Sequence, residues 1–128
     1  MPAIVNYVLH LLSALLLLAI FFIVYTRITP YHEVDLIKQG NPAAALSLSG
    51  ALIGFSLTIA SGILHSSSLL EFIGWSFGAL VVQMAAYYLA SKLADGVKPH
   101  IEAGNTAVGG FVGALSLTAG IVNAACLS

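Results

Sequence analysis

Residues 5–26 read VNYVLHLLSALLLLAIFFIVYT, a run with no Asp, Glu, Lys or Arg. About 20 consecutive apolar residues are enough for a helix to cross the hydrocarbon core of a bilayer. A secretory signal peptide would have a basic residue before the apolar run and a small-residue cleavage site after it, and neither is found here. We therefore expect Val5–Thr26 to be a membrane-spanning helix that stays in the protein.

Three further stretches have the same length and character, namely Pro42–Leu64, Leu69–Ser91 and Thr106–Leu127. Short polar segments join the four stretches, and together they account for nearly all of the 128 residues, which leaves no room for a soluble domain. The sequence predicts an all-α polytopic membrane protein in which residues 1–128 form a single four-helix transmembrane domain.

The composition agrees with a chain that lives in lipid. It is 59% hydrophobic and 7% charged, with a mean hydropathy of +1.01, whereas soluble domains are about 25% charged. A formal net charge of −1 gives no basic field for nucleic acid, so the expected partner is the lipid bilayer. The single cysteine, Cys126, cannot form an intrachain disulfide, and we expect it to be a small buried apolar side chain.

The basic residues predict the orientation. Lys and Arg occur only in the first and third connections, at Arg27, Lys38, Lys92 and Lys98. Because short loops rich in Lys and Arg stay in the cytoplasm, both termini and the turn at Ser66 should be extracytoplasmic. Aromatic residues near the span ends predict interfacial belts, with Tyr7, Phe72 and Trp75 outside and Tyr25, Tyr87 and Tyr88 inside.

Capping residues mark where three of the spans begin. Ser68 and Glu71 have the spacing of a capping box, in which the hydroxyl and the carboxylate satisfy the first free amides of a helix. Asn41 and Asn105 each follow a glycine and precede an apolar run, and we expect both to be N-caps.

Short motifs recur in the two halves of the chain. Pro-x-x-Glu occurs at 30–33 and at 99–102, and ALSLS at 45–49 resembles ALSLT at 114–118, although the spacing between the motifs differs. They predict two tandem two-helix hairpins, about 1–65 and about 66–128, related as a parallel repeat.

Small residues form one stripe on the second span and another on the fourth. The stripes consist of Ser47, Gly50, Gly54, Thr58 and Ser61, and of Gly109, Gly113, Ser116, Gly120 and Asn123. Small side chains let helix backbones approach closely, so helix packing is the expected role. Gln83, near the middle of the third span, is expected to form an interhelical hydrogen bond. The alternative for all these residues is the lining of a narrow conduit.

No pattern of catalytic, metal-binding or cofactor-binding residues emerges. The histidines share no helix turn, and the roles of His32 and His100, each beside a glutamate, stay open between a solvated loop surface and a paired proton or metal site. Glu33, Asp35, Asp95 and Glu102 are expected at the polar surface of the loops. Residues 29–39 could form an interfacial helix with Tyr31, Val34 and Ile37 toward lipid and Glu33 toward water, where a cytoplasmic or membrane protein partner could dock.

Three segments together resemble the YjfL-like family of bacterial inner-membrane proteins: YTRITPYHE at 25–33, GNPAAA at 40–45 and VNAAC at 122–126. The resemblance implies four spans in the bacterial inner membrane, and it brings no catalytic residue because the activity of the family is unknown. We expect a non-enzymatic, homo-oligomeric envelope subunit or scaffold. The alternative is a small channel or transporter for an ion or small solute.

Overall fold

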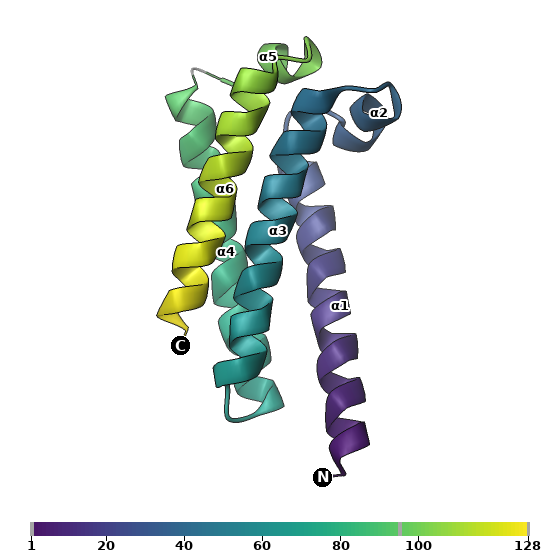
Figure 1. Cartoon of the computed structure of the whole chain (residues 1–128), viewed down its shortest axis with the longest axis vertical. Helices are drawn as coiled ribbons and strands as arrows, with labels where there is room; N and C mark the ends of the chain where they lie inside the picture. The colour runs from purple at the N-terminus through teal and green to yellow at the C-terminus, as the bar shows by residue number, and fades with distance from the viewer. Residues whose placement is uncertain (1, 95, 128) are drawn as a thin grey trace.

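The structure is a computed structural model that describes residues 2–94 and 96–127, and every secondary-structure element in those ranges is a helix. Figure 1 labels them α1 (Ala3–Ile28), α2 (Glu33–Lys38), α3 (Pro42–His65), α4 (Leu69–Leu93), α5 (Lys98–Glu102) and α6 (Thr106–Cys126). The four longer helices, α1, α3, α4 and α6, are long and apolar enough to cross a membrane. The prediction of an all-α chain with four candidate spans is therefore confirmed.

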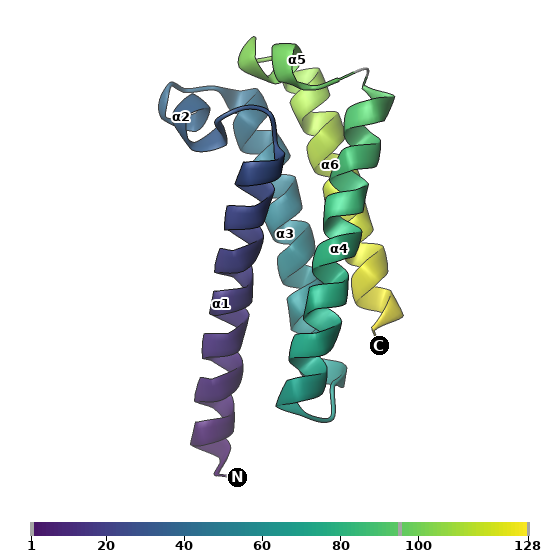
Figure 2. The ribbon, with the colours of Figure 1, turned by 180° about the vertical axis from the view of Figure 1, so that it is seen from behind.

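Each half of the chain contains a long helix, a short helix and a second long helix. The short helices α2 and α5 lie at one end of the bundle, whereas both termini point toward the other end (Figures 1 and 2). The basic side chains all lie at or beside the end that carries α2 and α5: Arg27, Lys38, Lys92 and Lys98. This element order is what a tandem repeat would produce, but the repeat itself and the side of the membrane on which each end lies stay predictions.

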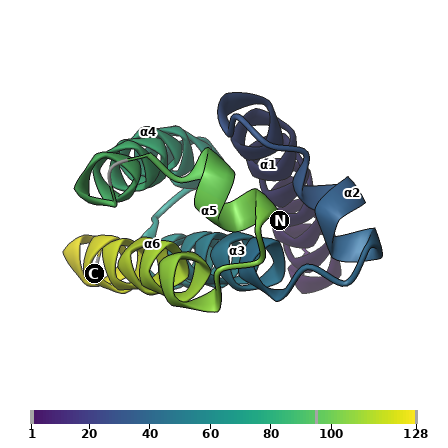
Figure 3. The ribbon, with the colours of Figure 1, turned by 90° about the horizontal axis from the view of Figure 1, so that it is seen from above.

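Helix α3 occupies the centre of the bundle and packs against α1, α4 and α6 (Figure 3). Its many small residues let neighbouring helices approach on more than one side, and α6 runs beside it along most of its length. Helix α1 buries one face only, through Ala14, Leu17, Phe21 and Tyr25. Its branched apolar side chains on the other faces are exposed and would contact lipid.

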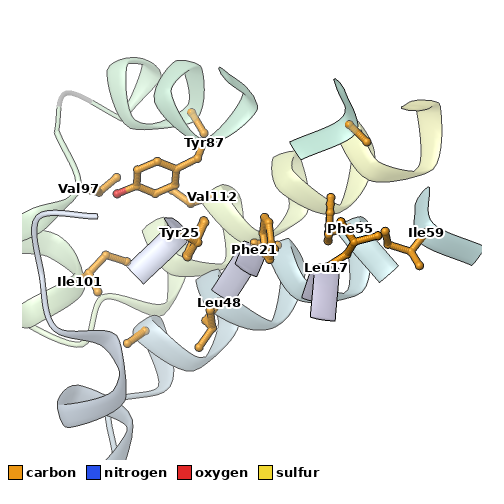
Figure 4. Packing of buried hydrophobic residues seen from close by; sticks show 14 of the residues in the cluster. Leu17, Phe21, Tyr25, Leu48, Phe55, Ile59, Tyr87, Val97, Ile101 and Val112 are labelled. Carbon is orange, nitrogen blue, oxygen red and sulfur yellow. The ribbon is translucent and has the colours of Figure 1, made fainter. Parts of the chain in front are cut away.

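Aromatic rings join α1 to its neighbours (Figure 4). Phe21 stacks on Phe55 of α3 with the ring centroids 4.6 Å apart, and Tyr25 meets Tyr87 of α4 edge-on at 5.2 Å. Such pairs stabilise by about 0.5–1.5 kcal/mol beyond the burial of their area. Tyr25, Tyr87 and Phe72 are buried, so they do not face lipid as rings of an interfacial belt would, because packing between helices takes them inward.

The helix starts agree with the sequence signals. The side chain of Asn41 accepts a hydrogen bond from the amide of Ala44, and that of Asn105 accepts from the amides of Ala107 and Val108. Ser68 caps α4 by accepting from the amide of Glu71. The Glu71 carboxylate, however, accepts from the amide and hydroxyl of Ser67, one residue before the position that a capping box predicts.

Candidate functional site

The backbones of α3 and α6 touch along the two small-residue stripes. A Cβ atom added at Gly50 would lie 2.1 Å from the carbonyl oxygen of Gly113, and one at Gly120 would lie 2.2 Å from that of Gly54. A Cβ at Gly109 would lie 2.4 Å from the carbonyl oxygen of Ala43. No side chain fits in these spaces, so the glycines set the distance between the helices.

Hydroxyl groups reinforce the same contact farther along the helices. Thr58 Oγ1 donates to the carbonyl oxygen of Gly120 at 3.0 Å, and Ser61 Oγ donates to that of Ala124 at 2.6 Å. Interhelical hydrogen bonds of this kind contribute about 0.6–2 kcal/mol each in membrane bundles. Two members of the second-span stripe therefore bind α6 through its backbone.

Gln83 bridges α4 and α6 inside the bundle. Its side chain is 1% exposed, and Nε2 donates to the carbonyl oxygen of Ser116 at 2.8 Å. Oε1 of Gln83 and the hydroxyl of Ser116 are buried and have no hydrogen-bond partner in the described part of the chain. The geometry is that of an interhelical bridge.

Ser47, the first residue of its stripe, has a different neighbourhood. Its Oγ lies 3.2 Å from the Tyr25 hydroxyl of α1 and 3.4 Å from the Tyr31 hydroxyl. The hydroxyl of Tyr87 in α4 donates to that of Tyr31 at 3.5 Å. Tyr25, Tyr31, Ser47 and Tyr87 thus form a buried hydroxyl cluster near the end of the bundle that carries α2 and α5.

Glu33, the first residue of α2, is buried beside this cluster. It is 1% exposed; Oε1 accepts a hydrogen bond from the Thr29 hydroxyl, and Oε2 is buried with no partner among the described residues. Burial raises the pKa of Glu33 from its ordinary 4.5 to about 7, and the hydrogen bond from Thr29 opposes part of that rise. Burial also raises the pKa of Tyr31 above its ordinary value.

The expected positions of Glu33 and Tyr31 were therefore wrong. Residues 29–39 were expected to form one interfacial helix, but α2 begins only at Glu33. Residues 29–33 instead alternate: Thr29, Tyr31 and Glu33 are buried and the residues between them are exposed. Pro30 disfavours a helical conformation for the residue before it, and Thr29 is extended, with φ −66° and ψ 138°. Pro30 was therefore the signal in the sequence that one helix would not include all of these residues.

A cavity of about 200 Å³ opens beside the buried carboxyl. It is lined by Thr26, His32, Glu33, Val34 and Asp35. His32 and Asp35 are exposed, as expected for a loop surface, and Glu102 is also exposed, whereas Asp95 lies outside the described residues. Within the described residues no group of His, Cys, Asp and Glu side chains could hold a metal ion.

A second cavity, about 510 Å³, is an apolar groove between α4 and α6. Asn123, predicted to belong to the packing stripe, lies in this groove, and its Nδ2 is buried with no partner among the described residues. Cys126 also lines the groove and is exposed, so the expectation of a buried thiol was wrong: the last turn of α6 is covered on one side only.

The chain matches the family model described as Domain of Unknown Function (DUF350) over residues 1–127. It is 36% identical over 109 residues to the UPF0719 inner membrane protein YjfL of Escherichia coli (strain K12), and the aligned residues cover 85% of this chain and 83% of that protein. It is 32% identical over 98 residues to the UPF0719 transmembrane protein YshE of Bacillus subtilis (strain 168), and the aligned residues cover 75% of this chain and 73% of that protein. No solved structure matches the chain.

These relatives and the four long apolar helices confirm the predicted localisation, a multi-pass protein of the inner membrane. The relatives bring no assigned activity. The resemblance to the YjfL-like family is confirmed, and the chain belongs to the family of the Domain of Unknown Function, DUF350.

Proposed function

We propose that this protein is a non-enzymatic subunit or scaffold of the inner membrane. The observation that carries the proposal is the backbone contact between α3 and α6, where the carbonyl of Gly113 fills the space beside Gly50. A bundle whose central helices touch in this way is rigid and closed at its centre. Three of its interior polar side chains, Thr58, Ser61 and Gln83, donate to backbone carbonyls of α6, which is a structural use of polar side chains.

We further propose that the scaffold is a homo-oligomer. The small-residue stripes are occupied within one chain, so a second copy would have to use another surface. The groove between α4 and α6 suits it, because Ala86 and Ala119 leave room for another helix and the unpartnered Asn123 amide offers a donor. A second copy inserted there would supply an acceptor for an amide that lipid tails cannot satisfy.

The oligomer is tested by native mass spectrometry of the protein in lipid nanodiscs. The parent should be a dimer or larger, and Ala119→Trp, which fills the groove, should be monomeric. Leu16→Trp is the matched control, because Leu16 is 62% exposed on the lipid-facing side of α1. A monomeric parent, or an oligomer that Ala119→Trp leaves intact, contradicts this assembly.

A small channel or transporter for an ion or solute is the second candidate, and the buried hydroxyl cluster favours it. Four hydroxyl groups contributed by α1, α3, α4 and the segment before α2 could pass a proton or coordinate a cation. Proteoliposomes loaded with a panel of ions and small solutes test it, with Gln83→Leu and Tyr31→Phe compared with the parent. Flux through the parent that either variant abolishes would favour the transporter over the scaffold. If the parent gives no flux above that of empty liposomes for any solute, the transporter is ruled out.

A further inference from the structure

The Glu33 carboxyl has no cation to balance it. Its Oε1 accepts a hydrogen bond from the Thr29 hydroxyl, and its Oε2 has no hydrogen-bond partner among the described residues. No basic side chain of the described residues pairs with it. An ionised carboxylate buried without a cationic partner is very costly, whereas a protonated carboxyl costs far less. The site therefore suits the neutral form of the side chain.

The side chains that act on Glu33 from the surrounding elements carry hydroxyl groups, and no basic side chain in the described ranges contributes to the shift of its pKa. Tyr25 comes from α1, Tyr87 from α4 and Tyr31 from the preceding segment, and all three interact electrostatically with Glu33. Helix α3 contributes Ser47 to the same cluster, a residue that does not titrate. Phenols ordinarily lose their proton near pH 10, so none of these groups supplies a charge near neutral pH.

A cavity at the loop end of the bundle has Glu33 among its lining residues. Its other lining residues are Thr26, His32, Val34 and Asp35. His32 and Asp35 are the titratable groups that share the cavity with Glu33, and both are exposed. Because Glu33 lines this cavity at the edge of the bundle, a local opening of residues 29–38 brings water to its carboxyl without a path through the apolar interior.

We propose that Glu33 is a proton-binding site that controls the docking of α2: the protonated carboxyl lets residues 29–38 pack on the bundle, and loss of the proton to water releases them. The pKa of Glu33, raised to about 7, places this exchange in the neutral range. Because the pKa in the folded protein is above the ordinary value of 4.5, docking is strongest below about pH 4.5 and weakens as the pH rises through about 7.

Infrared difference spectroscopy of the protein in lipid tests the proton directly. The carbonyl stretch of a protonated carboxylic acid should disappear with a midpoint near pH 7 in the parent and should be absent in Glu33→Gln. Thr29→Val removes the hydrogen bond that favours the ionised form, so its midpoint should move to higher pH. A parent without a titrating carboxyl signal between about pH 5 and about pH 9, or a signal that Glu33→Gln retains, overturns the proposal.

The docking of α2 is measured by distances between spin labels at Ile37→Cys and Leu46→Cys in a Cys126→Ser background. Ile37 in α2 and Leu46 in α3 are both partly exposed. The parent should show one short distance at about pH 5 and a longer, broader distribution at about pH 9. Glu33→Gln should keep the short distance at both, and the control His32→Gln should behave as the parent. A parent distance that does not change with pH, or a change that His32→Gln removes, overturns the proposal.

Discussion

Individual polar residues inside this protein fall into two kinds. Gln83, Thr58 and Ser61 donate to backbone carbonyls of α6, so their hydrogen bonds need no other side chain. Glu33 can only accept when it is ionised, and one of its oxygens has no donor in the described part of the chain. The neutral donors Gln83, Thr58 and Ser61 therefore stabilise the same helix packing at any pH. The packing around Glu33 instead depends on whether its carboxyl is protonated.

Gln83→Leu should lower the free energy of unfolding by at most about 2 kcal/mol. The change removes the hydrogen bond to the Ser116 carbonyl, but it also removes Oε1, which is buried without a partner. Unfolding in mixed detergent micelles measures the difference, with Met84→Leu, a volume-conserving change at a half-buried neighbour, as the control. A loss several times larger would mean that Gln83 supports a wider polar network.

Stability should depend on pH through Glu33. The rise of its pKa from 4.5 to about 7 corresponds to roughly 3 kcal/mol, which is the extra cost of ionising the carboxyl in the folded state. Unfolding free energy should therefore fall between about pH 4.5 and pH 7 and stay low above that range. Glu33→Gln should lack this part of the fall when the two are compared in the same detergent at each pH. Parallel curves for parent and variant would contradict the prediction.

The sequence predicted residues whose partners are local and missed those whose partners are distant. The Asn41 and Asn105 caps depend on amides two or three residues away, so the local pattern is sufficient. The burial of Glu33 depends on a segment that folds back toward tyrosines of α1 and α4, and no local pattern reports Tyr87. The local signal in this segment is Pro30, which disfavours a helical conformation for Thr29 but does not report what Glu33 packs against.

At the scale of elements, the long helices were the most predictable part. The third span begins at Leu69 as expected and ends two residues beyond the predicted Ser91, because length and hydropathy are properties of a single segment. Which helices pack on each other could not be predicted from the sequence in the same way. The two glycine-rich helices pack on each other within one chain, whereas GxxxG patterns alone are equally suited to contacts between chains.

Gly113→Ala should destabilise the bundle by about 1–3 kcal/mol, as overpacking of a close contact does. The added Cβ would lie 2.4 Å from the Leu46 carbonyl oxygen, so α3 and α6 would have to separate. Gly110→Ala is the matched control on the same helix, because a Cβ there meets nothing within 4 Å, and it should be neutral or stabilising by up to about 1 kcal/mol. Thermal unfolding of Gly113→Ala and Gly110→Ala measures the two changes in stability. Equal losses of stability in the two variants would contradict the close backbone contact at Gly113.

The basic side chains of the whole molecule are concentrated at one end of the bundle. Every Lys and Arg lies at or beside the end of the bundle that carries α2 and α5, together with the hydroxyl cluster and the cavity beside Glu33. The opposite end carries the turn between α3 and α4, with His65, Ser66 and Glu71 around a cavity of about 220 Å³. If the basic end is cytoplasmic, the proposed proton site responds to cytoplasmic pH, so the orientation of the chain decides which compartment it senses.

Reporter fusions determine that orientation. Short basic loops remain in the cytoplasm, so fusions after Ser67 and at the C-terminus should be active for an extracytoplasmic reporter, and a fusion after Gln39 should be active for a cytoplasmic one. A charge-shifted variant that combines Ser66→Lys and Ser67→Lys with Lys92→Gln and Lys98→Gln should insert in mixed orientations, because it moves half of the basic residues to the opposite end. A cytoplasmic signal after Ser67 in the parent would invert the chain and direct the Glu33 cavity toward the outside of the cell. Opposite signals from Ser67 and the C-terminus would instead contradict the arrangement in which the turn between α3 and α4 and the end of α6 both lie away from α2 and α5 (Figure 1).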